Sequence, residues 1–153
     1  MDEPLYVVRH TSLRWLTTVN HELFIWENKF ASIRGLTLKS GLNDARIDTT
    51  IRGKVASSDA KARTREWADE RVASALELSE NELLMQAPDN MMFETSAITA
   101  ARLTKHFGIC KLSVTLDDGR RLRWRWMNSA MCGRYEEVAP VLRRTLGSRL
   151  TAR

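Results

Sequence analysis

The strongest constraint on the fold lies in residues 109–126, where apolar and polar side chains alternate on both sides of the turn sequence LDDG (116–119). Alternation with a period of two is typical of a β-strand that buries one face, and Asp-Gly is a common turn sequence in hairpins. This segment therefore predicts a β-hairpin, and the length of its loop decides which side chains share a face.

A two-residue Asp-Gly loop would place Val114 opposite Arg123, so that apolar and charged side chains would share one face of the sheet. A three-residue loop over 117–119, with Gly119 in the left-handed conformation, avoids this conflict. In that register the apolar face consists of Cys110, Leu112, Val114, Leu122, Trp124 and Trp126. The opposite face carries Lys111, Ser113, Thr115, Arg121, Arg123 and Arg125.

The charged face of this hairpin is the main candidate for a binding surface. Lys111 and Arg125 are expected to lie directly opposite each other, and like charges across a strand pair are unfavourable, so the face favours a nearby anion. Arginine is well suited to phosphate, because its planar guanidinium group can donate two parallel hydrogen bonds. The predicted anion-binding residues are Lys111, Arg121, Arg123, Arg125, Arg143 and Arg144, and Arg149 could extend this set.

The charge of the chain is unevenly distributed along the sequence, although its net value is only +5. Residues 120–153 hold nine arginines against two glutamates, whereas residues 77–94 hold five acidic side chains and no basic one. Such asymmetry is compatible with a basic binding surface. It is equally compatible with an acidic segment that neutralises the basic one inside the fold, and the sequence leaves both interpretations open.

Residues 12–34 carry apolar side chains at spacings of three and four, which predicts a helix that ends at Gly35. These side chains are Leu16, Val19, Leu23, Trp26, Phe30 and Ile33. The β-branched residues at 17–19 and the run ELFIW (22–26) also fit strands, so a strand interpretation stays open. Residues 36–56 predict one or two short strands.

Two further helices are expected. Residues 59–78 are rich in strong helix formers, and Ser57 or Ser58 can cap this helix. Residues 136–147 predict a terminal helix that begins near Glu136 or Glu137, because Pro140 belongs in a first turn. Between these helices, residues 81–95 predict a hairpin with its turn at 88–90. Residues 96–104 predict one more strand, which Phe107–Gly108 would end.

Residues 79–150 resemble the second half of a bacterial PH-like or GRAM-like domain. The resemblance rests on NELLMQAPDNMMFETSAITAARL, KLSVTLDDGRRLRWRW and the closing helix EEVAPVLRRTL. It implies a bent antiparallel barrel capped by a C-terminal helix, and a non-catalytic module that binds protein segments or anionic lipid headgroups. No residue role is carried over, because no diagnostic motif supports one.

We therefore predict an α+β fold: an antiparallel sheet or partial barrel, PH-like in its second half, with a C-terminal capping helix and one or two further helices. A single domain over 1–153 is expected from the length. The alternative is a subdivision near 53–62 into segments 1–56 and 57–153.

The sequence contains no common catalytic motif, such as GxSxG, HExxH, GxxxxGK[ST] or GxGxxG. The histidines at 10, 21 and 106 are scattered, so a zinc site would lack a short-spaced ligand pair. His106 and Cys110 on one strand would lie about 13 Å apart, too far for proton transfer. Asp117 and Asp118 are explained by the turn itself. We expect neither an enzyme nor a bound metal or cofactor.

The N-terminus has no signal peptide, no apolar run could span a bilayer, and two cysteines are too few for a disulfide framework, so a cytoplasmic protein is expected. The predicted function is a non-enzymatic binding module for an acidic protein or an anionic lipid surface. Nucleic-acid binding through the same hairpin is the alternative, and a small enzyme is the third. Exposed tryptophans at 124 and 126 would favour nucleic acid, whereas buried ones would favour the first interpretation. Homo-oligomerisation is left open.

Overall fold

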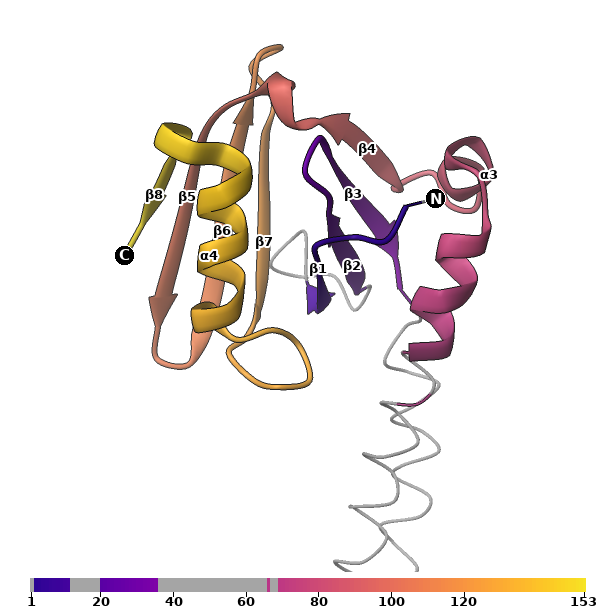
Figure 1. Cartoon of the computed structure of the whole chain (residues 1–153), viewed down its shortest axis with the longest axis horizontal. Coiled ribbons are helices and arrows are strands. Elements are labelled where there is room, and N and C mark those ends of the chain that lie inside the picture. Colours follow the sequence, from indigo (N-terminus) through magenta and orange to yellow (C-terminus); the bar gives the residue numbers. More distant parts are fainter. Residues whose placement is uncertain (1, 12–19, 36–65, 67–68) are drawn as a thin grey trace, which may run out of the picture.

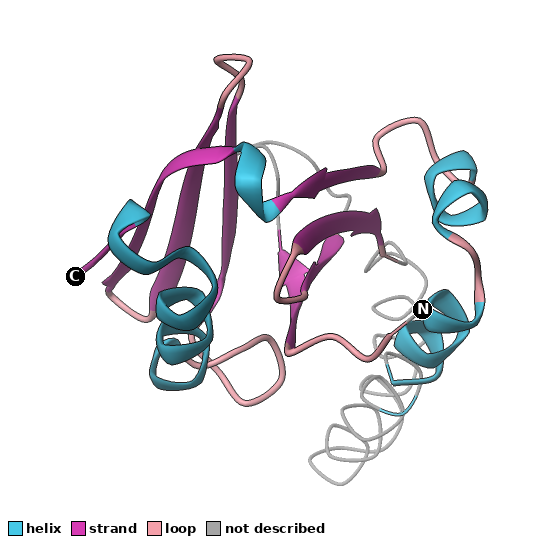
Figure 2. Ribbon diagram, turned by 45° about the horizontal axis from the view of Figure 1, so that its top comes forward, coloured by secondary structure: helices cyan, strands magenta, loops and turns pink. Residues whose placement is uncertain are grey.

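The computed structural model describes residues 2–11, 20–35, 66 and 69–153. Within them the chain forms two four-stranded sheets, with helices on one side of each (Figures 1 and 2). The strands predicted over 36–56, the caps predicted at Ser57 and Ser58, and the predicted break near 53–62 lie outside the described residues. The α+β class is confirmed, and the strands form two sheets without closing into a barrel.

The first sheet, called sheet A, is antiparallel throughout and has the strand order β1-β2-β3-β4. Its strands are β1 (Tyr6–Thr11), β2 (His21–Ile25), β3 (Lys29–Arg34) and β4 (Met91–Glu94). A tight turn joins β2 to β3, and the Trp26 backbone N–H donates to the Lys29 carbonyl at 2.9 Å. Strand β4 completes the sheet from a distant part of the chain.

The second sheet, called sheet B, has the order β7-β6-β5-β8. Strands β5 (Ile98–His106), β6 (Ile109–Leu116) and β7 (Arg121–Met127) form an antiparallel meander. Strand β8 (Leu150–Ala152) lies parallel to β5. The short 3-10 helix η1 (Thr95–Ala97) leads directly from β4 in sheet A to β5 in sheet B.

Three helices cover the sheets. Helix α4 (Tyr135–Leu146) packs on the inner face of sheet B and ends at Gly147, whose φ is +56°; the 3-10 helix η2 (Gly147–Arg149) then leads to β8. Helical residues 69–77 and α3 (Glu80–Met85) cover the other side of sheet A. None of the helices in the described part is both long and apolar enough to cross a bilayer.

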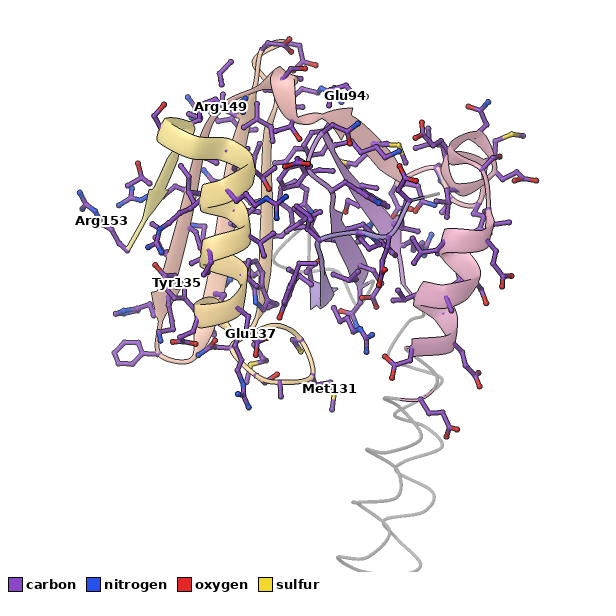
Figure 3. All side chains as sticks on the ribbon, in the orientation of Figure 1. Glu94, Met131, Tyr135, Glu137, Arg149 and Arg153 are labelled. Atoms are coloured by element: carbon purple, nitrogen blue, oxygen red, sulfur yellow. The ribbon has the colours of Figure 1, made fainter. Side chains whose placement is uncertain are left out.

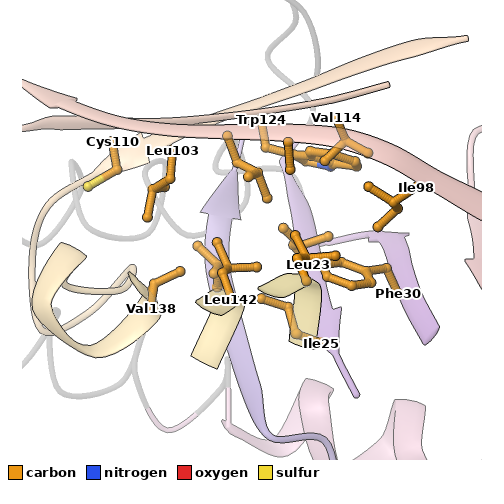
Figure 4. Close-up of a cluster of buried hydrophobic side chains, with 14 of the residues drawn as sticks. Leu23, Ile25, Phe30, Ile98, Leu103, Cys110, Val114, Trp124, Val138 and Leu142 are labelled. Carbon is orange, nitrogen blue, oxygen red and sulfur yellow. The ribbon is translucent and has the colours of Figure 1, made fainter. Parts of the chain in front are cut away.

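The larger hydrophobic core lies between sheet B, α4 and the inner face of sheet A (Figure 4). Side chains from all three layers meet there, including Leu23, Ile25, Phe30, Leu103, Cys110, Val114, Trp124, Val138 and Leu142. A second core, with Phe24, Trp26, Ala31, Ile33, Ala75 and Leu83, lies on the far face of sheet A. Among the described residues, sheet A is therefore buried on both faces, whereas sheet B is covered on one.

The helix predicted for 12–34 is wrong where the structure describes this segment, because residues 21–34 form the β2–β3 hairpin. Leu23 and Ile25 face the larger core, while Phe24 and Trp26 face the second core. A strand buried on both faces is apolar at successive positions, so the period of two disappears from the sequence. Residues 12–19 of this prediction lie outside the described part.

The hairpin predicted for 81–95 is wrong in its first half and confirmed in its second. Residues 91–94 form strand β4, but the preceding residues form helix α3. A capping box starts this helix: the Glu82 N–H donates to the Ser79 hydroxyl, and the Glu82 carboxylate accepts from the Ser79 N–H at 2.8 Å. The Ser-x-x-Glu spacing satisfies otherwise unpaired N–H groups, which favours the helix over a strand.

The helices predicted for 59–78 and 136–147 are present where the structure describes them, but the expectation that Pro140 lies in a first turn is wrong. Residues 59–65, 67 and 68 of the first helix lie outside the described residues. Val72, Ala75 and Leu76 of the predicted helix 59–78 pack into the second core. Helix α4 begins at Tyr135, one residue before the predicted start, so Pro140 lies within the helix and not in its first turn.

Candidate anion-binding site

The β6–β7 hairpin has the predicted register. Val114 pairs with Leu122, and Lys111 pairs with Arg125, as a three-residue loop requires. The backbone of Gly119 has a φ of +84°, the left-handed conformation that a glycine adopts without strain. The apolar face points into the larger core, and the charged face points to solvent.

Both aspartates of the turn form hydrogen bonds, Asp117 through its backbone and Asp118 through its side chain. The Asp117 backbone N–H donates to the Ala97 carbonyl at 2.8 Å. The Asp118 carboxylate accepts from the Arg120 backbone N–H at 2.9 Å and from the Arg120 Nε at 2.6 Å. These hydrogen bonds lower the pKa of Asp118. The Asp118 side chain is thereby used to fix the loop geometry.

Strand β5 adds a third row to the charged face that the sequence analysis did not predict. Arg102 lies opposite Ser113, and Thr104 lies opposite Lys111. The signal was present in the sequence, because Ala101 and Leu103 alternate with these two residues and face the core. Finding the row also required knowing that β5 pairs with β6.

We call the solvent-facing side of β5, β6 and β7 the basic face. It consists of the cations Arg102, Lys111, Arg121, Arg123 and Arg125 and the hydroxyl residues Thr104, Ser113 and Thr115. In this array cations and hydroxyl groups occupy neighbouring positions across the strands. Most of its side chains line a hollow of about 460 Å³ on the surface of sheet B. Guanidinium, ammonium and hydroxyl groups all donate hydrogen bonds, so the hollow suits an anion.

The acidic stretch 77–94 does not cover the basic face. Glu80 pairs with Lys29 on sheet A, and Asp89 lies 3.2 Å from His21. Glu82 is used in the capping box of α3. Within the described ranges, no carboxylate forms an ion pair with the cations Arg102, Lys111, Arg121 and Arg123.

The structure does not bring Arg143, Arg144 and Arg149 to the basic face, because α4 packs on the opposite side of sheet B. Arg143 is exposed, and Arg144 lies 3.1 Å from Glu27 in the β2–β3 turn. Arg149 lies near η1 (Figure 3), where its guanidinium donates to the carbonyls of Thr95 at 2.7 Å and Ile98 at 2.8 Å. Arg149 therefore ties the end of α4 to the junction between the two sheets.

The two tryptophans of the hairpin are buried, as the predicted register requires. Trp124 is 0% exposed and donates its indole N–H to the Ser32 hydroxyl at 3.0 Å. Trp126 is 3% exposed and donates to the Gly133 carbonyl at 3.0 Å. Because both rings lie in the core, neither can stack on a nucleic-acid base.

The cysteines offer no accessible nucleophile in the described residues. Both Cys110 and Cys132 are free thiols and buried, and burial raises the pKa of each. His106 and Cys110 lie on different strands, because His106 pairs with Ile109 across the β5–β6 turn, and Cys110 points into the core. No group of three or more His, Cys, Asp or Glu side chains in the described part could hold a metal ion.

One histidine does meet a carboxylate and a hydroxyl. His21 Nε2 lies 3.2 Å from Asp89 Oδ2, and His21 Nδ1 lies 3.3 Å from the Ser32 Oγ. Burial lowers the pKa of His21, and the negative charge of Asp89 partly opposes this shift. Ser32 has no exposed surface and already accepts a hydrogen bond from Trp124, so this chain of polar groups connects the two sheets.

No family model matches the sequence, and comparisons with curated proteins and with solved structures gave no match. The resemblance to PH-like or GRAM-like domains therefore stays a prediction.

Proposed function

We propose that the protein is a non-enzymatic binding module that engages the anionic surface of an acidic protein or a lipid through the basic face of sheet B. One observation carries this proposal: five cations from three strands share one solvent-facing surface. Four of them, Arg102, Lys111, Arg121 and Arg123, form no ion pair with a described carboxylate.

The arrangement of the cations supports a role outside the molecule. Arg102 and Arg123 lie on opposite sides of Ser113 in the two neighbouring strands, so two positive charges flank one hydroxyl group. An external anion bound at this position is attracted by both cations. The neighbouring hydroxyl groups of Ser113 and Thr115 can donate further hydrogen bonds to phosphate or carboxylate oxygens.

The other two interpretations have less support. Nucleic-acid binding through the hairpin could not use Trp124 or Trp126 for stacking, because both are buried in the core. The histidine–hydroxyl pair at His21 is a poor catalytic pair, because its hydroxyl belongs to the fully buried Ser32 and a substrate cannot reach it. We therefore place binding to an acidic protein or a lipid surface ahead of both.

The test compares two double variants that remove the same charge from different surfaces. Arg121→Ser/Arg123→Ser removes two cations from the basic face, and Arg143→Ser/Arg144→Ser removes two cations from α4. Binding is measured to fluorescein-labelled poly-glutamate, and to phosphatidylcholine vesicles with and without phosphatidylserine, at several salt concentrations.

Each cation close to an anionic membrane contributes about 1 kcal/mol, so the basic-face variant is expected to lose about 30-fold in affinity for any anionic probe that the native protein binds. The α4 variant should bind like the native protein. Equal losses in the two variants, or no native binding to either anionic probe at low salt, would contradict the proposal.

A further inference from the structure

The turn between β5 and β6 places a large apolar side chain where the fold does not favour one. Phe107 and Gly108 form the two-residue loop, with φ values of +46° and +73°. Positive φ at both positions is the geometry of a type I′ turn, which favours Asn-Gly. A bulky residue in the left-handed region is an outlier, and Phe107 gains nothing from burial because it is 91% exposed.

Phe107 belongs to a small exposed apolar group. Met127 is 61% exposed and pairs with the half-buried Ile109, which follows the turn directly. The ring of His106 lies 4.1 Å from the ring of Phe107. We call Phe107, Ile109 and Met127 the apolar tip. Neither burial nor backbone conformation explains the phenylalanine, and this combination indicates a contact outside the molecule.

The apolar tip continues the basic face at one end of sheet B. The pair Ile109–Met127 precedes the pair Lys111–Arg125 by two residues, which is about 7 Å along the strands. Because the spacing is two, both pairs lie on the same side of the sheet. The β5–β6 turn lies at the end of sheet B opposite the β6–β7 turn, away from sheet A (Figure 1).

We propose that this surface docks on an anionic lipid bilayer, with the apolar tip inserted at the boundary between headgroups and acyl chains and the basic face on the headgroup phosphates. The inference rests on the proposed function and selects the lipid among its partners. A protein attached to a membrane interface combines inserted apolar side chains with attraction to anionic lipids, and stable attachment needs both contributions.

The shape of the tip favours a bilayer over an acidic protein. The turn projects into open space, because apart from Gly108 and its two chain neighbours no atom lies within 4 Å of a Cβ built at Gly108. A protein partner would need a pocket shaped for this projection, whereas a fluid bilayer needs none. Nucleic acid is a separate outcome of the test, because a base could stack on the exposed ring of Phe107 but not on the aliphatic Ile109 and Met127.

The test removes the apolar character of the tip and leaves the charge unchanged. In the variant Phe107→Asn/Met127→Ser, asparagine suits the left-handed position of the turn. The melting temperature of this variant should therefore be at least that of the native protein. The matched control is Met85→Ser, because Met85 is also exposed, at 86%, but lies on α3. Binding is measured to vesicles of phosphatidylcholine with phosphatidylserine, to labelled poly-glutamate and to labelled single-stranded RNA.

We expect Phe107 and Met127 each to gain roughly half of their full transfer energy on insertion into the bilayer. The tip variant loses this gain and should bind the anionic vesicles about 30-fold more weakly. Its binding to poly-glutamate should stay within about twofold of the native value, and Met85→Ser should change neither. An environment-sensitive dye on Phe107→Cys should shift to shorter wavelength when anionic vesicles are added.

Three results would overturn the inference. The first is unchanged vesicle binding by the tip variant, and the second is an equal loss for poly-glutamate, which would indicate a protein partner. The third is native binding to poly-glutamate or RNA but not to vesicles. The second result, and the third if the native protein binds poly-glutamate, would leave the proposed anion-binding role of the basic face intact. That role fails if the native protein binds neither poly-glutamate nor anionic vesicles, or if Arg121→Ser/Arg123→Ser loses no more affinity than Arg143→Ser/Arg144→Ser.

Discussion

Sheets A and B are both four-stranded, but they differ in what covers them. All five residues of β2 in sheet A are buried, because a core lies on each side of the strand. In sheet B, strand β6 alternates between buried and half-buried positions over its whole length. A sheet between two layers has both faces buried, whereas the described part of sheet B packs one face into the core and leaves the other on the surface.

The largest effect that tests this difference is expected at Trp124, which joins the inner face of sheet B to sheet A. Trp124→Ala should lower the free energy of unfolding by about 3–5 kcal/mol, because the fully buried ring leaves a cavity and Ser32 loses its hydrogen-bond donor. Urea unfolding measures this change. Trp124→Phe keeps most of the ring and should lose much less, and a loss below about 1 kcal/mol for the alanine variant would show that the two sheets are not packed as described.

An intermediate effect is expected on the pH dependence of stability, through the buried His21 of sheet A. Burial lowers its pKa below the unfolded value of about 6.5, so below that pH the unfolded state binds more protons than the folded state. The stability contribution of neutral His21 is therefore complete above pH 6.5 and is lost as the pH falls below it.

Thermal unfolding between about pH 7.5 and 5.5 measures this dependence, in a range above the usual titration of carboxylates. The melting temperature of the native protein should fall toward the acidic end. His21→Gln, which cannot titrate, should show a flatter profile even if it is less stable overall. An identical slope in both proteins would assign the pH dependence to other groups.

The smallest effect on stability is expected on the basic face. Arg102→Ser/Arg123→Ser should change the free energy of unfolding by less than about 0.5 kcal/mol, because both side chains are exposed and lie near other cations. Chemical denaturation beside the Trp124 variants gives the comparison. A loss of more than about 2 kcal/mol would mean that the side chains of the basic face make a large contribution to the stability of sheet B.

The same difference explains how far the sequence could predict the fold. In sheet B, one buried face and a short turn leave a clear alternation, and the register of Lys111 with Arg125 followed from it residue by residue. In sheet A, Leu23 and Phe24 are both apolar because they face different cores, and the resulting pattern resembles a helix. A local sequence pattern does not show whether a second layer of the fold covers a strand.

The candidate site was predictable to the same extent. Arg121, Arg123 and Arg125 were placed correctly opposite β6, because a three-residue turn fixes their neighbours. Arg102 was missed, because its position depends on which strand β5 joins. Arg144 was placed on the wrong surface, because the side of a sheet on which a helix packs depends on tertiary contacts and not on local spacing.

The order in which the strands pair along the chain has a consequence for folding kinetics. The meander β5-β6-β7 closes through loops of two and three residues, whereas β3 joins β4 only when Ser32 meets Met91. Closing a long loop costs more entropy than closing a short turn, and non-local pairings form slowly. We expect pulsed hydrogen-exchange labelling during refolding to protect the amides of β6 before those of β3. The surface that carries the arginines would then exist early, while the sheet that holds it in place is still being assembled.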